Sequence, residues 1–308
     1  MEGPLVSIGI PTYNRLEGLK KVLDCIVCQT YKNIEVIVSD NASPGNAIGD
    51  FVLEYCKKDS RIKFTRQNVN IGAIANFIFV MDQAQGKYFM WAADDDEFSP
   101  ITIEQSVYGF LQNDAVVLSS LNCNIIDLNK GTVIQPLIIP HTVSYENKIK
   151  FRKVIDYMFN EINVYFYSLI KLDALKKCNS YKAKIFGADV FLLLELLEYG
   201  DININTSQVG LTSYMHSSQA SASMDSYIKI KNTELNIWHR NLFFSNYLFT
   251  YLKFISKTQK LKINEKIPLF FYVIREWITT KKFHLVKYDL RLHKPVQWTK
   301  KWIKKMFI

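Results

Sequence analysis

Short apolar runs alternate with helical segments over the first hundred residues, and this alternation constrains the fold more than any other feature of the sequence. The apolar runs are Leu5–Ile10, Ile34–Ser39, Ile62–Thr65 and Lys87–Ala92. Between them, apolar residues recur at helical spacing in the segments 15–29, 47–58 and 73–84. Strands that alternate with helices form a mostly parallel sheet with helices on both faces, so the sequence predicts an α/β fold.

Polar residues follow each of the four apolar runs. They form the segments 11–14, 40–43, 66–72 and 94–96. Ligands of parallel α/β sheets bind at the carboxyl ends of the strands, so we expect these segments to line one crevice. The last segment is an aspartate triplet, Asp94, Asp95 and Asp96. Taken alone, the triplet fits a solvated acidic turn as well as a site for Mg²⁺ or Mn²⁺, which bind oxygen ligands.

Charge divides the 308 residues into two unequal parts. Residues 1–228 contain 20 Lys and Arg against 25 Asp and Glu, whereas residues 229–308 contain 18 against 4. We therefore expect a folded body at 1–226, with halves at 1–114 and 115–226, and a helical, basic C-terminal region at 227–308. Within the second half, the pattern predicts strands in the segments 115–139 and 163–172 and a helix at 190–197.

The cysteines and the hydropathy of the sequence indicate the cellular compartment of the protein. Five cysteines at irregular spacing argue against a disulfide framework and for a reducing compartment. Cys25 and Cys28 fall in a helical segment without a second pair, which favours buried thiols over a zinc or redox site. The N-terminus lacks the pattern of a signal peptide, and no window approaches the ~18 uninterrupted apolar residues of a membrane span. We therefore expect a cytoplasmic protein.

The end of the chain combines tryptophan with lysine. Four lysines lie between residues 300 and 305 on a short amphipathic segment. Trp302 lies among them, and Trp298 lies just before them. This pattern is typical of peripheral binding to an anionic membrane surface. Nucleic acid is the rival partner, but the aromatic residues form an apolar face rather than scattered stacking platforms, so we expect no nucleic acid. The apolar stripe at 238–255 favours packing on the body or a homo-oligomer formed through the C-terminal helices.

Four stretches of the sequence carry a family resemblance. In order along the chain they are SIGIPTYNR, IVSDNAS, RQNVNIGAIANF and GKYFMWAADDDEFSP. In this order and spacing they resemble an inverting glycosyltransferase of family 2, strongly over residues 5–100 and more weakly to about 220. The resemblance implies a Rossmann-like GT-A fold, in which 1–114 binds a nucleotide-sugar, with a UDP-sugar expected first, and 115–226 binds the acceptor. It also implies Mn²⁺ or Mg²⁺ as cofactor, and a saccharide or polyprenyl-linked glycan as acceptor.

For the donor, the resemblance implies contacts from every strand end. Asp40 would accept a hydrogen bond from the nucleobase, with a turn or helix cap as the alternative role. Arg66 would approach the base or the diphosphate, with a plain surface arginine as the alternative. The full set of donor-binding candidates is Pro11, Thr12, Tyr13, Asp40, Arg66, Asn70, Asn76, Asp94 and Asp95.

For the metal, the resemblance implies Asp96 as the direct ligand. The triplet begins one position later than in the common family pattern L-D-x-D-D, with Ala93 in place of the first carboxylate. The division of roles among the three aspartates therefore stays open. His216 lies in the segment 211–223, which resembles a flexible loop of the family, and is a candidate to complete the metal site. A structural or exposed histidine is the alternative.

For the acceptor, the resemblance implies Asp189 as the general base that deprotonates the attacking hydroxyl. Ala188 stands where the family has a glutamate. This difference affects the expected contacts with the acceptor and not the assignment of the base. A carboxylate at the start of a helix is also favoured electrostatically, so a structural cap is the alternative role for Asp189.

Together these features predict a metal-dependent inverting glycosyltransferase at the cytoplasmic face of the membrane, in bacterial surface polysaccharide synthesis. A nucleotidyltransferase is one alternative, but it needs a Gly-rich, basic phosphate loop after the first strand, and residues 11–15 do not form one. The other alternative is a catalytically inactive, glycosyltransferase-like membrane scaffold. Such a scaffold would need neither the aspartate triplet nor Asp40 and Asp189.

Overall fold

The computed structural model describes residues 3–128, 131–134, 142–143, 164–182, 188–215 and 245–279. The chain divides into two compact units, one made of residues 1–183 and 188–223 and the other of residues 184–187 and 224–308. The domain boundary expected after residue 226 lies outside the described residues.

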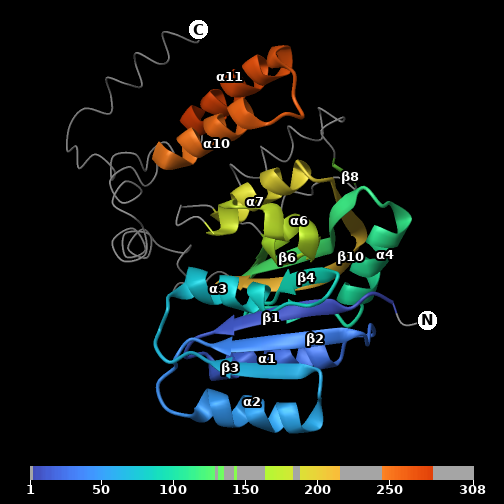
Figure 1. The fold of residues 1–308 in the computed structure, drawn as a ribbon, viewed down its shortest axis with the longest axis vertical. Helices are drawn as coiled ribbons and strands as arrows, with labels where there is room; N and C mark the ends of the chain where they lie inside the picture. Colours follow the sequence, from blue (N-terminus) through green and yellow to red (C-terminus); the bar gives the residue numbers. More distant parts are fainter. Residues whose placement is uncertain are drawn as a thin grey trace, which may run out of the picture. The chain divides into compact units, whose positions relative to one another are not determined.

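The first hundred residues form the predicted alternation of strands and helices (Figure 1). The strands are β1 (Val6–Thr12), β2 (Ile34–Asp40), β3 (Ile62–Arg66) and β4 (Tyr88–Trp91). The helices between them are α1 (Leu16–Val27), α2 (Ala47–Lys58) and α3 (Ala73–Asp82). The strands run parallel in the order β3-β2-β1-β4, and every residue of β1, β2 and β4 is buried. Burial on both faces explains why these strands are continuous apolar runs rather than alternating ones.

The second half extends the same sheet with mixed strand directions. Its elements are β5 (Glu97–Phe98), α4 (Thr102–Gln112), β6 (Val116–Asp127), β7 (Thr132–Ile134), β8 (Thr142–Val143), β9 (Leu169–Lys171) and β10 (Asp201–Met215). β9 lies antiparallel between β4 and β6, and β10 runs parallel to β6. The predicted fold class, an α/β protein with a mostly parallel sheet flanked by helices, is confirmed. The segment 211–223 is not a loop throughout, because Leu211–Met215 is the end of β10.

The strand expected at 163–172 is only partly correct. Val164–Tyr167 forms a 3-10 turn, η1, and only Leu169–Lys171 pairs into the sheet as β9. Stacking of Phe166 on Trp91, with ring centroids 4.5 Å apart and planes 6° apart, explains the difference. The aromatic run packs against the end of β4 instead of entering the sheet. It is followed by α6 (Leu172–Lys177), η2 (Ser180–Lys182) and α7 (Ala188–Leu197), the last of which confirms the helix predicted at 190–197.

A buried carboxylate ties the strands together at the amino-terminal end of the sheet. Glu35, 5% exposed, accepts hydrogen bonds from Ser7 Oγ at 2.6 Å and from the backbone N of Gln85 at 2.7 Å. Lys63 Nζ donates to its other carboxylate oxygen at 2.8 Å. Burial acts to raise the pKa of Glu35, but the hydrogen bonds from Lys63, Ser7 and Gln85 outweigh it and lower that pKa overall. Every oxygen of this carboxylate is therefore satisfied.

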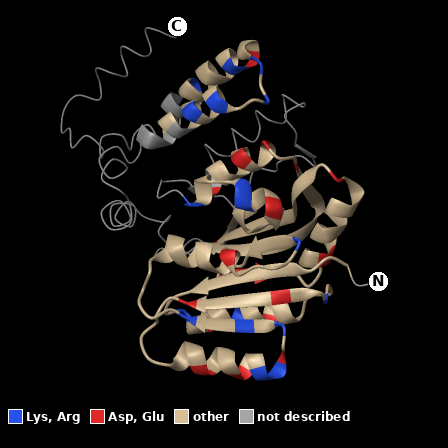
Figure 2. Cartoon of the chain, viewed as in Figure 1, with Lys and Arg blue, Asp and Glu red and all other residues tan. Residues whose placement is uncertain are grey.

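The second unit is described by its two helices, α10 (Ser245–Lys257) and α11 (Ile263–Thr279), which pack on each other. Tyr251, Ile255 and Val273 are buried, and lysines and arginines lie along both helices (Figure 2). Among the described helices, none is both long enough and apolar enough to span a membrane. The tryptophan- and lysine-rich segment at 298–307 lies outside the described residues.

Candidate active site

The carboxyl ends of β1, β2 and β4 lie next to one another, because β1 pairs with both of its neighbours. Thr12 is in register with Asp40 on β2, and Gly9 with Trp91 on β4. Thr12 Oγ1 donates a hydrogen bond of 2.7 Å to Oδ2 of Asp94, which follows β4. The structure thus brings together polar segments that are 82 residues apart in the sequence. The neighbouring Tyr13 is 45% exposed just beyond β1.

Asp40 lies fully buried at the end of β2. Its Oδ1 accepts hydrogen bonds from the backbone N of Ser43, at 3.1 Å, and from the Ser43 hydroxyl. Its Oδ2 makes no hydrogen bond with a described residue and lies 3.5 Å from Nε of Arg66. Arg66 also donates to the Ser43 carbonyl at 2.6 Å. One oxygen of Asp40 therefore caps the turn, as the structural alternative proposed, while the other pairs with the guanidinium of Arg66.

Asn70 and Asn76 have side chains that hold the crevice wall. Asn70 Oδ1 accepts hydrogen bonds from Asn41 Nδ2 at 3.1 Å and from the backbone N of Gly72 at 2.9 Å. Asn76 is buried and exchanges two hydrogen bonds with Ser39, through its Oδ1 at 2.6 Å and its Nδ2 at 3.0 Å. Both asparagines therefore bind to Ser39 and Asn41 at the end of β2, and their side chains make these hydrogen bonds within the protein.

Arg15 joins the site although sequence reasoning did not single it out. Its Nη1 lies 3.2 Å from Oδ1 of Asp94 and 2.5 Å from Oδ2 of Asp95. Arg15 directly precedes α1. The polar segment 11–14 after β1 and the start of α1 therefore place its side chain next to the triplet. The signal was available, because three adjacent carboxylates need a counter-charge and Arg15 is the cation of the SIGIPTYNR stretch.

A glycine allows α1 to approach the triplet closely. A Cβ atom on Gly18 would lie 1.9 Å from the backbone oxygen of Asp94, closer than any real Cβ contact. Only a residue without a side chain therefore lets the first turn of α1 rest on the loop that carries the aspartates. The spacing between Arg15 and Asp94 depends on this contact.

The aspartates of the triplet differ in burial and in partners. Burial raises the pKa of Asp94, against the opposing effects of Arg15 and Thr12. Burial, together with the charge of Asp95, raises the pKa of Asp96 to about 7, although hydrogen bonds from Ser213 and Tyr214 act in the opposite direction. Asp96 is 2% exposed, and its Oδ2 makes no hydrogen bond with a described residue. A buried carboxylate oxygen without a partner is energetically costly and indicates a position that a ligand completes.

The donor set around Asp96 fits a hard cation. Mg²⁺ and Mn²⁺ take oxygen ligands, and Mg²⁺ is commonly held by one or two carboxylates together with substrate phosphates. The described residues contain no group of three His, Cys, Asp or Glu side chains placed to hold a metal by themselves. The buried, unpartnered oxygen of Asp96 is therefore the type of ligand that such a cation takes. His216 lies outside the described residues.

Asp189 is the second residue of α7 and is partly buried. Its charge reaches the hydroxyl of Tyr167, and so do the charges of Asp94, Asp95 and Asp96. The candidate base and the aspartate triplet, which are about 95 residues apart in the sequence, therefore both act on the pKa of one phenol, whose turn packs on β4 and on α7. Sequence reasoning did not single out Tyr167, because an aromatic residue in an apolar run carries no functional signal of its own.

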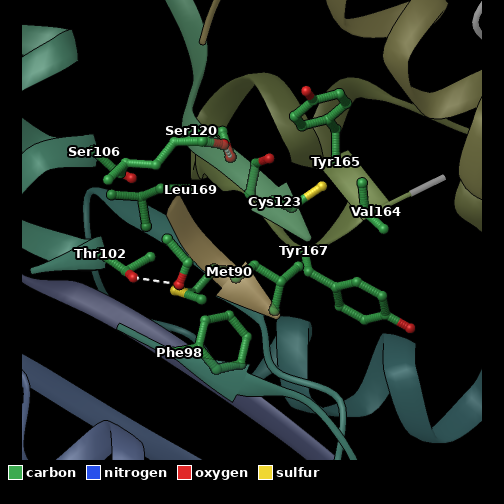
Figure 3. Close-up of a pocket in the computed structure, with 14 residues that line it drawn as sticks. Met90, Phe98, Thr102, Ser106, Ser120, Cys123, Val164, Tyr165, Tyr167 and Leu169 are labelled. Atoms are coloured by element: carbon green, nitrogen blue, oxygen red, sulfur yellow. Dashed lines mark hydrogen bonds between the residues drawn. The ribbon is translucent and has the colours of Figure 1, made fainter. Parts of the chain in front are cut away.

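A small cavity lies behind the site, between β6, β10 and η1 (Figure 3). It is lined by polar and apolar side chains, among them Thr102, Ser106, Ser120 and Cys123. Its volume of about 10 Å³ is enough for roughly one water molecule. A nucleotide-sugar does not fit in this cavity.

The model of the family described as glycosyl transferase family 2 matches residues 7–177 of the chain. The chain belongs to this family. The match covers both halves of the sheet, from β1 through η1 and β9 to the end of α6. The family resemblance inferred from the four sequence stretches is confirmed.

Curated relatives match part of the chain. It is 33% identical over 132 residues to an uncharacterised glycosyltransferase of Rickettsia bellii, covering 42% of this chain and 16% of that protein. It is 38% identical over 95 residues to the GalNAc(5)-diNAcBac-PP-undecaprenol beta-1,3-glucosyltransferase of Campylobacter jejuni, covering 30% of each. The chain thus spans less than a third of the length of these two relatives.

Solved structures share the fold. The crystal structure of Staphylococcus aureus TarS 1–349 has a TM-score of 0.65 and 14% identity, covering 97% of this chain and 78% of that one. A mannosyltransferase from Pyrobaculum calidifontis, solved with GDP-Man and Mn²⁺, has a TM-score of 0.52 and 13% identity, covering 97% and 83%. TarS has also been solved with UDP and with UDP-GlcNAc. These likenesses confirm the GT-A fold.

Proposed function

We propose that this chain is a metal-dependent inverting glycosyltransferase that moves a sugar from a nucleotide-sugar to a saccharide or lipid-linked glycan. The observation that carries the proposal is the unpartnered, buried oxygen of Asp96, beside Asp94 and Thr12 at the strand ends. Membership of glycosyl transferase family 2 supports the reaction class. The C. jejuni relative, named for an undecaprenol-linked substrate, supports a lipid-linked glycan as acceptor. The UDP complexes of TarS support a UDP-sugar as the first donor to test.

In this proposal the crevice binds the donor through groups at each strand end. Pro11, Thr12 and Tyr13 line the base and ribose, and Oδ2 of Asp40 accepts a hydrogen bond from the base. Arg15 neutralises charge on Asp94 and Asp95, which allows a diphosphate to approach the triplet. Mn²⁺ or Mg²⁺, held by Asp96, would offset charge on the leaving diphosphate when bound.

The transfer itself exchanges one bond at the anomeric carbon of the donor sugar. The acceptor hydroxyl oxygen forms a bond to that carbon on the face opposite the diphosphate. The bond to the diphosphate oxygen breaks, and its electron pair leaves with the nucleoside diphosphate. Attack on that face inverts the configuration at the anomeric carbon, and Asp189 takes the proton of the acceptor hydroxyl.

We also propose that the second unit brings the enzyme to an anionic membrane surface, as surface polysaccharide synthesis on a lipid-linked acceptor requires. Ile263, Ile267 and Phe271 are each more than half exposed and recur every four residues on α11. This spacing forms one apolar stripe on the helix. Lysines 260, 262 and 266 adjoin it, which suits an interface with anionic headgroups. Binding to vesicles with and without anionic lipid tests this part separately from catalysis.

The test of the reaction is nucleoside diphosphate release from UDP-, GDP-, dTDP- and CDP-sugars, with and without Mn²⁺. The wild-type chain is compared with Asp96→Ala and with Asp50→Ala, which removes an exposed carboxylate on α2. We expect one donor to be turned over by wild type and by Asp50→Ala, only with metal, and not by Asp96→Ala. If no donor is bound under any condition, the enzyme proposal fails and a membrane scaffold becomes the better account.

A further inference from the structure

The phenol of Tyr167 is held between the two parts of the proposed active site. Its turn, η1, packs on β4, which leads into the aspartate triplet, and on α7, which carries Asp189. Phe166 stacks on Trp91 at the end of β4, and the ring of Tyr167 stands edge-on to Phe166 with centroids 5.3 Å apart and planes at 88°. Two ring contacts therefore fix the position of this phenol relative to β4.

The surroundings of the hydroxyl are acidic. Burial, followed by the charges of Asp96, Asp95, Asp189 and Asp94, holds the pKa of Tyr167 well above its ordinary value. The phenol is therefore protonated and neutral at pH 7. None of the hydrogen bonds between described residues uses this hydroxyl. A neutral group that can both donate and accept hydrogen bonds thus lies within electrostatic range of the aspartate triplet and of Asp189.

We propose that Tyr167 is a positioning residue that holds the attacking molecule between the donor sugar and Asp189. This inference rests on the proposed function, and adds a residue to it. When water attacks, the phenol oxygen accepts a hydrogen bond from the O–H of water whose proton is not transferred to Asp189. When a sugar hydroxyl attacks, the phenol donates to a neighbouring oxygen of the same sugar. Tyr167 transfers no proton in either case, and the attacking lone pair stays directed at the anomeric carbon.

Tyr165 provides a matched control two residues earlier in the same turn. It is a tyrosine of η1 as well, and both tyrosines line the small cavity, but its phenol points in a different direction from that of Tyr167 (Figure 3). Deleting the Tyr165 hydroxyl tests whether the loss of any phenol oxygen in this turn affects catalysis. Tyr165→Phe and Tyr167→Phe each delete one oxygen and keep the ring packing.

The experiment measures donor hydrolysis, with water as the attacking molecule, in the metal-containing wild type and both variants. Calorimetry gives the donor dissociation constant, and thermal unfolding gives stability. For Tyr167→Phe we expect kcat to fall about tenfold, with the donor dissociation constant and stability unchanged, because a misplaced nucleophile slows only the chemical step. Tyr165→Phe should keep the wild-type kcat.

Each other outcome is decisive. A Tyr167→Phe enzyme with wild-type kcat overturns the inference and leaves the proposed function intact. Equal losses in both variants, or weaker donor binding together with lower stability, assign Tyr167 a structural role and also overturn it. Absence of donor turnover by the wild-type chain overturns the proposed function, and the role of Tyr167 with it.

Discussion

The two ends of the central sheet each bury a carboxylate, and the two carboxylates are in opposite states. At the amino-terminal end, Glu35 accepts hydrogen bonds from Ser7, Gln85 and Lys63, and its pKa is lowered. At the carboxyl-terminal end, Asp96 keeps one oxygen without a hydrogen bond to a described residue, and its pKa is raised to about 7. Both residues are 5% exposed or less, so exposure to solvent does not separate them.

The two carboxylates differ in whether the folded protein provides hydrogen-bond partners for both of their oxygens. Glu35 contributes to stability because its partners come from the protein itself. Asp96 lowers the stability of the unliganded protein. Residues that destabilise a protein in this way are found at functional sites, where a ligand provides the missing partner. The same residue class at two ends of one sheet thus separates into a structural group and a functional group.

The largest expected effect is on catalysis. Asp96→Asn keeps the shape of the side chain but removes the charge, so we expect sugar transfer to fall about 10³-fold, as when a main electrostatic contact to the reacting groups is lost. Glu35→Gln, the matched change at the other end of the sheet, should keep kcat within about twofold. Steady-state release of nucleoside diphosphate measures both, and similar losses in the two variants would break the comparison.

The second effect is on stability. Here we expect the change at Glu35, and not the change at Asp96, to cause the loss. Glu35→Gln weakens two charge-assisted contacts in a buried network, and we expect a loss of about 2 kcal/mol in the free energy of unfolding. Asp96→Asn should be as stable as wild type at pH 7 or more stable, because it removes a poorly satisfied buried charge. Urea denaturation of the metal-free proteins decides this, and a strongly destabilised Asp96→Asn would assign Asp96 a structural role.

The third effect is the pH dependence of stability. The pKa of Asp96 is about 7 in the folded protein, against 3.8 for an unperturbed aspartate, so between these values the folded state holds a proton that the unfolded state lacks. Stability from this group is therefore full below about pH 4 and falls as pH rises to about 7, by at most ~1.4 kcal/mol per pH unit. The difference in unfolding free energy between Asp96→Asn and wild type should grow over this range and level off above it. A constant difference from pH 5 to 8 would contradict the account.

The smallest effect concerns the backbone beneath the triplet. Gly18→Ala forces the Asp94 carbonyl away from α1, and we expect a loss of about 1–2 kcal/mol in stability together with slower transfer. Gly49→Ala is the control in α2, where the nearest atom to a Cβ is Cε1 of Phe64 at 3.8 Å, and it should gain up to ~1 kcal/mol from helix propensity. Thermal unfolding and turnover of the two variants, measured side by side, show whether the Asp94 loop tolerates displacement.

The sequence predicted the part of the fold that depends on local pattern. Continuous apolar runs and helical spacing were enough for β1 to β4, their helices and the parallel direction of the strands, because strands buried on both faces leave a clear apolar signal. The turn η1 was predicted as a strand, since a run of aromatic residues has strand propensity and only the stacking of Phe166 on Trp91 removes it from the sheet.

The candidate site was predictable where a residue type suggests chemistry and not where a distant partner defines the role. The aspartate triplet, Asp40 and Asp189 stood out as carboxylates at strand or helix ends. Arg15 and Tyr167 did not, because their roles depend on groups brought near by folding, up to 80 residues away for Arg15. The network around Glu35 was missed for the same reason.

Binding of Mn²⁺ in the presence of a nucleoside diphosphate tests the central contrast most directly. Electron paramagnetic resonance titrations with UDP and with GDP, on wild type, Asp96→Asn and Glu35→Gln, require no acceptor and no turnover. We predict that one nucleotide supports binding of one Mn²⁺ by wild type and by Glu35→Gln, and that Asp96→Asn binds it at least about tenfold more weakly, since a carboxylate ligand is lost. Equal Mn²⁺ affinity in wild type and Asp96→Asn would contradict the account.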